Sequence, residues 1–208
     1  MRFLLLILSL CIASPALAQL MVPLGMPDGK VGCFPGQTGI GRPSVWTSVA
    51  DPEAHGGWAL AETGGDATDL RFPLCVSPEA GSRDFDASLR FKPISGTRDK
   101  AAGLIFRAQN GSDYYVVKAS ALDNTVRLYR MLGGRRMQLA SKEIEVKTGQ
   151  WQTLRVAALV DRIEAWLDDK PLFGVNDRSL MHPGAIGVWS QADSLTYYGL
   201  LLVTPMTP

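Results

Sequence analysis

Short segments in which apolar and polar residues alternate run through most of this sequence. This alternation, with its period of two, constrains the fold more than any other feature. Residues 84–91 are one such segment, in which polar residues alternate with the apolar set Phe85, Ala87, Leu89 and Phe91. A period of two places apolar side chains on one face of a β-strand and polar side chains on the other. The segment therefore predicts a strand with one buried face.

Similar segments follow at spacings near ten residues, separated by turn signals such as Asn110-Gly111 and Gly133-Gly134. They are residues 103–108, 113–120, 124–130, 135–141, 151–159, 162–167, 171–175, 185–190 and 197–203. No window of a dozen residues shows a helical stripe, and residues 176–180 are the best candidate for a short helical turn. Recurrent strands without alternating helices predict an all-β fold of two packed antiparallel sheets.

The first 18 residues predict a secretory signal peptide. They begin with the basic Arg2, continue with an apolar run and end in Ala16-Leu17-Ala18, with small residues where a signal peptidase reads. We expect cleavage near Ala18 and a secreted or periplasmic protein; a lipid anchor at Cys11 is disfavoured by the bulky Leu10. The apolar run is shorter than the roughly 20 residues that cross a bilayer, so no membrane span is predicted.

Removal of 18 from 208 residues leaves 190, a length that suits one domain. Residues 19–43 are rich in Gly and Pro and predict an extended N-terminal arm. Residues 44–208 predict the β-sandwich domain. Without Arg2 the chain carries 20 basic and 20 acidic residues, a balance that favours neither nucleic acid nor an anionic membrane as partner.

Cys33 and Cys75 remain after signal cleavage and predict one disulfide in an oxidising compartment. Two free buried thiols are the alternative. No metal site or cofactor is predicted, because His55 and His182 lack clustered partner ligands. Calcium at Asp123-Asn124 or Asp168-Asp169 is conceivable, but no twelve-residue calcium loop is present and turn formation is the preferred interpretation.

Three motifs carry a family resemblance over about residues 45–204. They are a G-x-x-x-R strand from Gly103 to Arg107, a G-x-W-x-x-L-x-V strand with Gly149, Trp151, Leu154 and Val156, and the hairpin of residues 168–173. In these features the chain resembles the concanavalin A-like lectin/glucanase superfamily, in particular laminin-G-like and 3-keto-disaccharide hydrolase domains. The resemblance implies a jelly-roll sandwich whose concave sheet often carries sugar or calcium.

The candidate catalytic carboxylates are Asp84, Asp86 and Glu164, and Glu143 with Glu145 is a second geometrically possible pair. Glycoside hydrolysis generally needs two carboxylates, and residues two apart on one strand share a face, as Asp84 and Asp86 would. The laminarinase pattern Glu-x-Asp-x-x-Glu is absent, and Asp84-Phe85-Asp86 is its nearest approach. An ordinary solvated sheet face is the preferred interpretation of this pair. No catalytic residue is therefore assigned, and a hydrolase of the 3-keto-disaccharide type is kept as an alternative function.

Alternation also turns a set of aromatic and charged side chains away from the core. Aromatic residues and arginine often carry binding energy in recognition sites. The candidate ligand-binding residues are Arg107, Lys118, Arg127, Tyr129, Glu164, Trp166 and Trp189. They predict a secreted, non-catalytic protein that binds carbohydrate or a glycan-bearing partner, provided that they converge on one sheet.

Three other interpretations of these residues stay open. The arm or a rim loop would cover Trp166 or Trp189. Arg107 and Arg127 would pair with Glu164 across strands. The whole protein would be a structural interaction module of the cell envelope.

Overall fold

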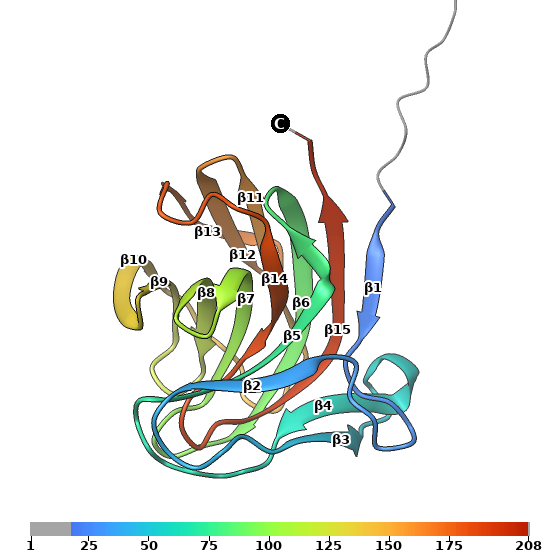
Figure 1. The fold of residues 1–208 in the computed structure, drawn as a ribbon. Helices are drawn as coiled ribbons and strands as arrows, with labels where there is room; N and C mark the ends of the chain where they lie inside the picture. Colours follow the sequence, from blue (N-terminus) through green and yellow to red (C-terminus); the bar gives the residue numbers. More distant parts are fainter. Residues whose placement is uncertain (1–17, 208) are drawn as a thin grey trace, which may run out of the picture.

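Two antiparallel sheets pack face to face in a computed structural model that describes residues 18–207 (Figure 1). The predicted signal peptide, apart from Ala18, lies outside the described residues. The all-β sandwich predicted from the alternating segments is confirmed. A single turn of 3-10 helix, η1 (His55–Gly57), is the helical element of the described chain.

The eight-stranded sheet has the order β13-β12-β11-β6-β15-β4-β3, with β1 also paired to β15. Its strands are β1 (Leu20–Pro23), β3 (Trp46–Ala50), β4 (Trp58–Glu62), β6 (Phe85–Ser95), β11 (Gln152–Leu159), β12 (Arg162–Leu167), β13 (Lys170–Asn176) and β15 (Leu195–Pro205). The seven-stranded sheet has the order β10-β9-β8-β7-β14-β5-β2. Its strands are β2 (Phe34–Gly39), β5 (Arg71–Ser82), β7 (Ala101–Asn110), β8 (Asp113–Ser120), β9 (Thr125–Leu132), β10 (Arg135–Glu143) and β14 (Gly184–Trp189).

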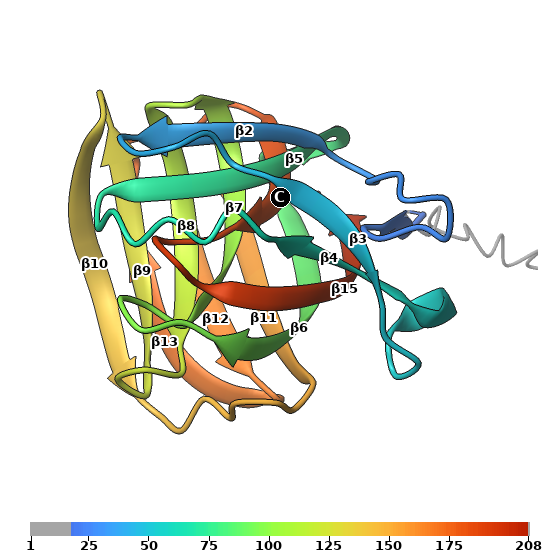
Figure 2. The ribbon, with the colours of Figure 1, turned by 90° about the horizontal axis from the view of Figure 1, so that it is seen from below.

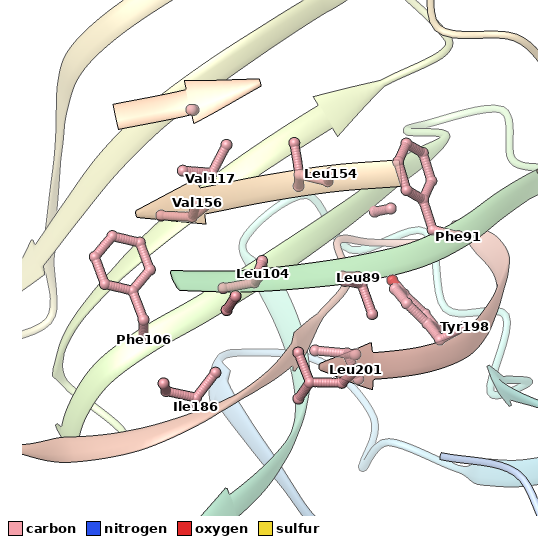
Figure 3. Packing of buried hydrophobic residues seen from close by; sticks show 14 of the residues in the cluster. Leu89, Phe91, Leu104, Phe106, Val117, Leu154, Val156, Ile186, Tyr198 and Leu201 are labelled. Carbon is pink, nitrogen blue, oxygen red and sulfur yellow. The ribbon is translucent and has the colours of Figure 1, made fainter. Parts of the chain in front are cut away.

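The main core lies between the two sheets, where the apolar half of each alternating strand points inward. Figure 3 shows Leu89 of β6 and Leu104 of β7 in the middle of this core, with Phe91 and Phe106 on opposite sides of the view, and all four are fully buried. Burial of a large apolar side chain stabilises the fold by roughly 1.5–3 kcal/mol. The inward-facing apolar side chains therefore supply most of the free energy that holds the two sheets together.

The predicted helical turn at residues 176–180 is wrong. Asn176 ends β13, and Asp177 accepts hydrogen bonds from the Tyr115 hydroxyl and, at 2.8 Å, from the Ser179 amide. Polar contacts with the neighbouring sheet therefore shape this segment as a bend.

The Gly/Pro-rich arm of residues 19–43 is part of the sandwich. It supplies β1 to the eight-stranded sheet and β2 to the edge of the seven-stranded sheet. The disulfide predicted between Cys33 and Cys75 is confirmed, with an S–S distance of 2.09 Å. It fastens the start of β2 to β5, and Figure 2 shows these two strands running across the direction of β7, β8 and β9.

Candidate functional site

Trp189 faces away from the main core, as alternation predicts, but it is fully buried in a second apolar cluster. Its ring stacks on Phe72 with centroids 5.4 Å apart. The cluster lies on the outer face of the seven-stranded sheet and consists of Phe72, Leu74, Ile105, Tyr114, Val116, Met131 and Trp189. The arm helps to cover it, because Thr38 of β2 is hydrogen-bonded to the Tyr114 hydroxyl at 3.0 Å. Trp189 therefore supports this face and presents no surface to a ligand.

Arg107 is also fully buried, and the prediction that it faces outward is wrong. Its φ of 47° belongs to an irregularity in β7 after Phe106, which breaks the alternation. The guanidinium donates hydrogen bonds to the carbonyls of Arg83, Leu180 and Val160. Burial lowers the pKa of Arg107, with Asp84 opposing this effect. Arg107 thus ties loops together at one end of the sandwich.

The seven-stranded sheet is concave on its outer face. Arg136 of β10 lies 5.1 Å from the Phe72 ring centroid of β5 and 4.9 Å from that of Tyr129 on β9. The sheet order places β9, β8, β7 and β14 between β10 and β5. A flat sheet would separate β10 and β5 by roughly 24 Å at the usual strand spacing. The contact shows that the sheet curls around this face.

A group of polar side chains, which we name the basic strip, lies on this concave face. It consists of Lys118, Arg127, Tyr129, Arg136 and Gln191. Lys118 and Arg127 are direct cross-strand neighbours, and Arg136 stacks on Tyr129. Three of the predicted binding residues are therefore brought together, and Arg136 and Gln191 join them.

Hydrogen bonds connect the members of the basic strip. Gln191 Oε1 accepts from Lys118 Nζ at 3.1 Å and from Arg136 Nη1 at 3.3 Å. Gln191 Nε2 donates to the Asp69 carbonyl at 3.1 Å. Because its amide is engaged on both sides, Gln191 holds the Lys118 and Arg136 side chains in place relative to Asp69, in the turn before β5.

Two carboxylates partly neutralise the strip. Lys118 forms an ion pair with Asp99, and burial lowers the pKa of Lys118 although Asp99 opposes this. Arg127 pairs with Asp123 at 2.7 Å, and this pairing outweighs partial burial to raise the pKa of Arg127. The ion pairs thus fix the positions of Lys118 and Arg127 in the basic strip.

A hollow of about 260 Å³ adjoins the strip, since Phe72 lines it and also touches Arg136. The residues around it are Gln37, Thr38, Gly39, Phe72, Gly111, Ser112, Met131 and Gly134. They come from β2, β5, β9 and the turns that follow β7 and β9. The strip and the hollow together form the candidate site.

Arg136 is not among the predicted binding residues, although the sequence contains the information that places it on this face. A two-residue hairpin turn at Gly133-Gly134 fixes the register, so that Arg136 lies opposite Met131 as the structure shows. Residues 127, 129 and 131 share a face, and Arg136 then belongs to it. Gln191 lies in the loop after β14, where alternation makes no prediction.

Glu164 and Trp166 lie on the outer face of the eight-stranded sheet, so the seven candidate residues do not converge on one sheet. Arg155 lies 4.4 Å from the Trp166 ring centroid, and Glu164 pairs with Arg162 at 3.1 Å. The alternative pairing of Glu164 with Arg107 or Arg127 is also wrong. Alternation states which face a side chain occupies and not to which sheet its strand belongs.

Asp84 and Asp86 do not form a pair. Asp84 is buried and accepts hydrogen bonds from Arg83 Nε at 2.7 Å and from the Val160 amide at 2.6 Å. Burial would raise the pKa of Asp84, but these partners outweigh it and lower the pKa, whereas a general acid needs a raised one. Asp86 lies on the outer face of the eight-stranded sheet in an ion pair with Arg155.

The two Asp-containing turns considered for calcium serve as tight turns. Asn124, Asp168 and Asp169 all have positive φ, which Asn and Asp tolerate better than most residues. Within residues 18–207, no three His, Cys, Asp or Glu side chains are grouped to hold a metal ion. Over the same range, no helix has the length and apolar character needed to cross a membrane.

No protein-family model and no curated protein matches this chain in sequence. Solved structures match its fold. The carbohydrate-binding module CBM66 from Bacillus subtilis is 18% identical with a TM-score of 0.60, over 80% of this chain and 93% of that one. A Bacillus subtilis protein of unknown function with a galectin-like fold is 13% identical with a TM-score of 0.63, over 92% and 97%.

Domain 4 of AbnA, an extracellular arabinanase from Geobacillus stearothermophilus solved with arabinotriose, is 12% identical with a TM-score of 0.58. The match covers 92% of this chain and 94% of that domain. At such identities the likeness concerns the fold alone. The chain thus shares the two-sheet, galectin-like β-sandwich fold of these structures.

Proposed function

We propose that this protein binds carbohydrate, or a glycan-bearing partner, outside the cytoplasm and does not cleave it. The observation that carries the proposal is the basic strip, where Lys118, Arg127, Tyr129, Arg136 and Gln191 meet on one concave face. Arginine and amide groups hydrogen-bond sugar hydroxyls, and half-buried tyrosine offers an apolar ring at little entropic cost.

The solved structures support the same function. Two proteins with similar folds are a carbohydrate-binding module and a domain in complex with arabinotriose. The disulfide is consistent with an oxidising compartment, as the predicted signal peptide requires.

A titration of wild-type protein with a panel of neutral and acidic oligosaccharides tests the proposal. The double variant Arg127→Ala, Tyr129→Ala removes two members of the strip, and we expect it to weaken binding at least tenfold, as loss of charged hydrogen bonds does. The matched control is Arg155→Ala, Trp166→Ala, which removes the arginine and aromatic pair of the other sheet and should leave affinity unchanged. Loss of binding in the control alone, or no binding by wild type, would contradict the proposal.

The two alternative functions make different predictions. A 3-keto-disaccharide hydrolase would turn over an oxidised disaccharide and lose this activity on Glu164→Gln. A structural envelope module would capture a protein partner and be indifferent to sugars. Neither is favoured by a specific contact, since Glu164 is ion-paired on the outer face away from the strip.

A further inference from the structure

Arg136 differs from the other cations of the concave face in its partners. Lys118 is matched by Asp99, Arg127 by Asp123, and the neighbouring Arg98 by Asp69 at 3.3 Å. Among residues 18–207, by contrast, no carboxylate oxygen lies within 4.0 Å of an Arg136 nitrogen. Each carboxylate near the strip is therefore already engaged, and the charge of Arg136 is not compensated.

The position of Arg136 is nevertheless well defined. Its guanidinium lies against the rings of Tyr129 and Phe72, at 4.9 and 5.1 Å from their centroids. Nη1 donates one hydrogen bond to Gln191. A guanidinium has five N–H donors, so most of its donors are available while the stacked rings restrict its motion. The residue as a whole is exposed.

We propose that Arg136 binds the carboxylate of an acidic sugar, so that the ligand of this protein is a glycan that contains uronic acid. This inference rests on the proposed function. A planar guanidinium matches a carboxylate in a two-pronged arrangement that a hydroxyl does not reproduce. The half-buried Tyr129 then contacts the same sugar, while Gln191, which is buried and hydrogen-bonded to Lys118, holds Arg136 in place.

The charge balance of the face indicates how many acidic groups are recognised. Of four basic residues, Arg98, Lys118 and Arg127 each pair with one carboxylate, those of Asp69, Asp99 and Asp123, and Arg136 does not. A densely charged polyanion would meet these three carboxylates as well. The face therefore suits one carboxylate in an otherwise uncharged environment, and binding should weaken only modestly with added salt.

The experiment compares acidic oligosaccharides with their own methyl esters, which differ in charge and little else. Oligosaccharides that carry a single galacturonic, glucuronic or mannuronic acid are each titrated as free acid and as ester by calorimetry. We expect wild type to prefer at least one acid over its ester by about tenfold or more. Arg136→Gln should abolish this preference, and Arg136→Lys, which keeps the charge without the planar fork, should retain a smaller one.

Arg155→Gln is the matched control. Arg155 also stacks on an aromatic ring, Trp166, but its guanidinium is already bound by Asp86. This variant should keep the full preference for the acid. Thermal denaturation of each variant checks that it is folded.

Two outcomes would overturn the inference while leaving the proposed function intact. They are equal binding of acids and esters by wild type, and a preference that persists in Arg136→Gln. Tighter binding of a sulfated oligosaccharide than of every uronate would overturn the carboxylate assignment. Failure of wild type to bind any neutral or acidic glycan would refute the proposed function, and the inference with it.

Discussion

Trp189 and Trp166 occupy equivalent places in the alternation of their strands and have different environments in the fold. Trp189 is fully buried against Phe72, and its Nε1 lies 3.4 Å from the Tyr114 hydroxyl. Gly103 makes this possible, because a Cβ there would lie 2.9 Å from Trp189 Cε3. Trp166 is half-buried and packs against Arg155 on the opposite side of the molecule.

This difference predicts unequal effects on stability. Trp189→Ala removes a fully buried ring and should lower the free energy of unfolding by about 3–5 kcal/mol. Trp166→Ala empties a partly solvated site and should cost clearly less. Urea denaturation of both variants measures the difference, and equal losses would show that Trp189 is not the centre of a second core.

At the scale of elements, the connection between β6 and β7 is held by one carboxylate. Asp193 accepts hydrogen bonds from the backbone amides of Thr97, Arg98 and Asp99, and from the Thr97 hydroxyl. Partial burial would raise the pKa of Asp193, but these donors lower it from 3.8 to about 2. The same connection carries Asp99 to Lys118, so Asp193 indirectly positions the basic strip.

The depressed pKa of Asp193 predicts a pH dependence of stability. Because the folded value lies below the unfolded one, the stabilisation is fully present above about pH 4 and is lost as the pH falls towards 2. Asp193→Asn should flatten the stability profile in this window and cost about 1–3 kcal/mol at neutral pH. Asp169→Asn, in an exposed turn, is the control. An unchanged profile in Asp193→Asn would contradict the prediction.

At the scale of the whole molecule, the sheets are joined by a buried ion pair as well as by the apolar core. Arg71 of β5 and Glu62 of β4 lie 2.7 Å apart, with side chains 0% and 1% exposed. Arg71 also donates to the carbonyls of Ala192 and Arg42. The pair thus connects an end of the seven-stranded sheet to β4 and to the loops around both.

Removal of one partner from this pair should be strongly destabilising. Glu62→Ala leaves the Arg71 charge buried without compensation, and we expect a loss of about 3–5 kcal/mol in the free energy of unfolding. Asp86→Ala breaks the more exposed pair with Arg155 and should cost under about 1 kcal/mol. Chemical denaturation of the two variants measures both losses. A small effect of Glu62→Ala would contradict the role of this ion pair in joining the sheets.

Local periodicity was enough to predict the sandwich and the strands from β6 to β15, but β1 to β5 are not among the predicted segments. Residues 113–120 and 162–167 are β8 and β12 without any change of bounds, because alternation reports directly which side chains are buried. The pairing of Cys33 with Cys75 followed from their number and compartment. The position of Arg136 on the concave face is also predictable from the sequence, since a two-residue hairpin fixes its register.

The tertiary structure alone decided which strands share a sheet, and this separated Glu164 and Trp166 from the basic strip. It also decided that β2 and β5 arch over the concave face and bury Trp189, and that a backbone irregularity turns Arg107 inward. These outcomes depend on contacts between residues far apart in the sequence. Alternation within one strand carries no information about such contacts, because it records the face of a side chain and not the neighbour that covers it.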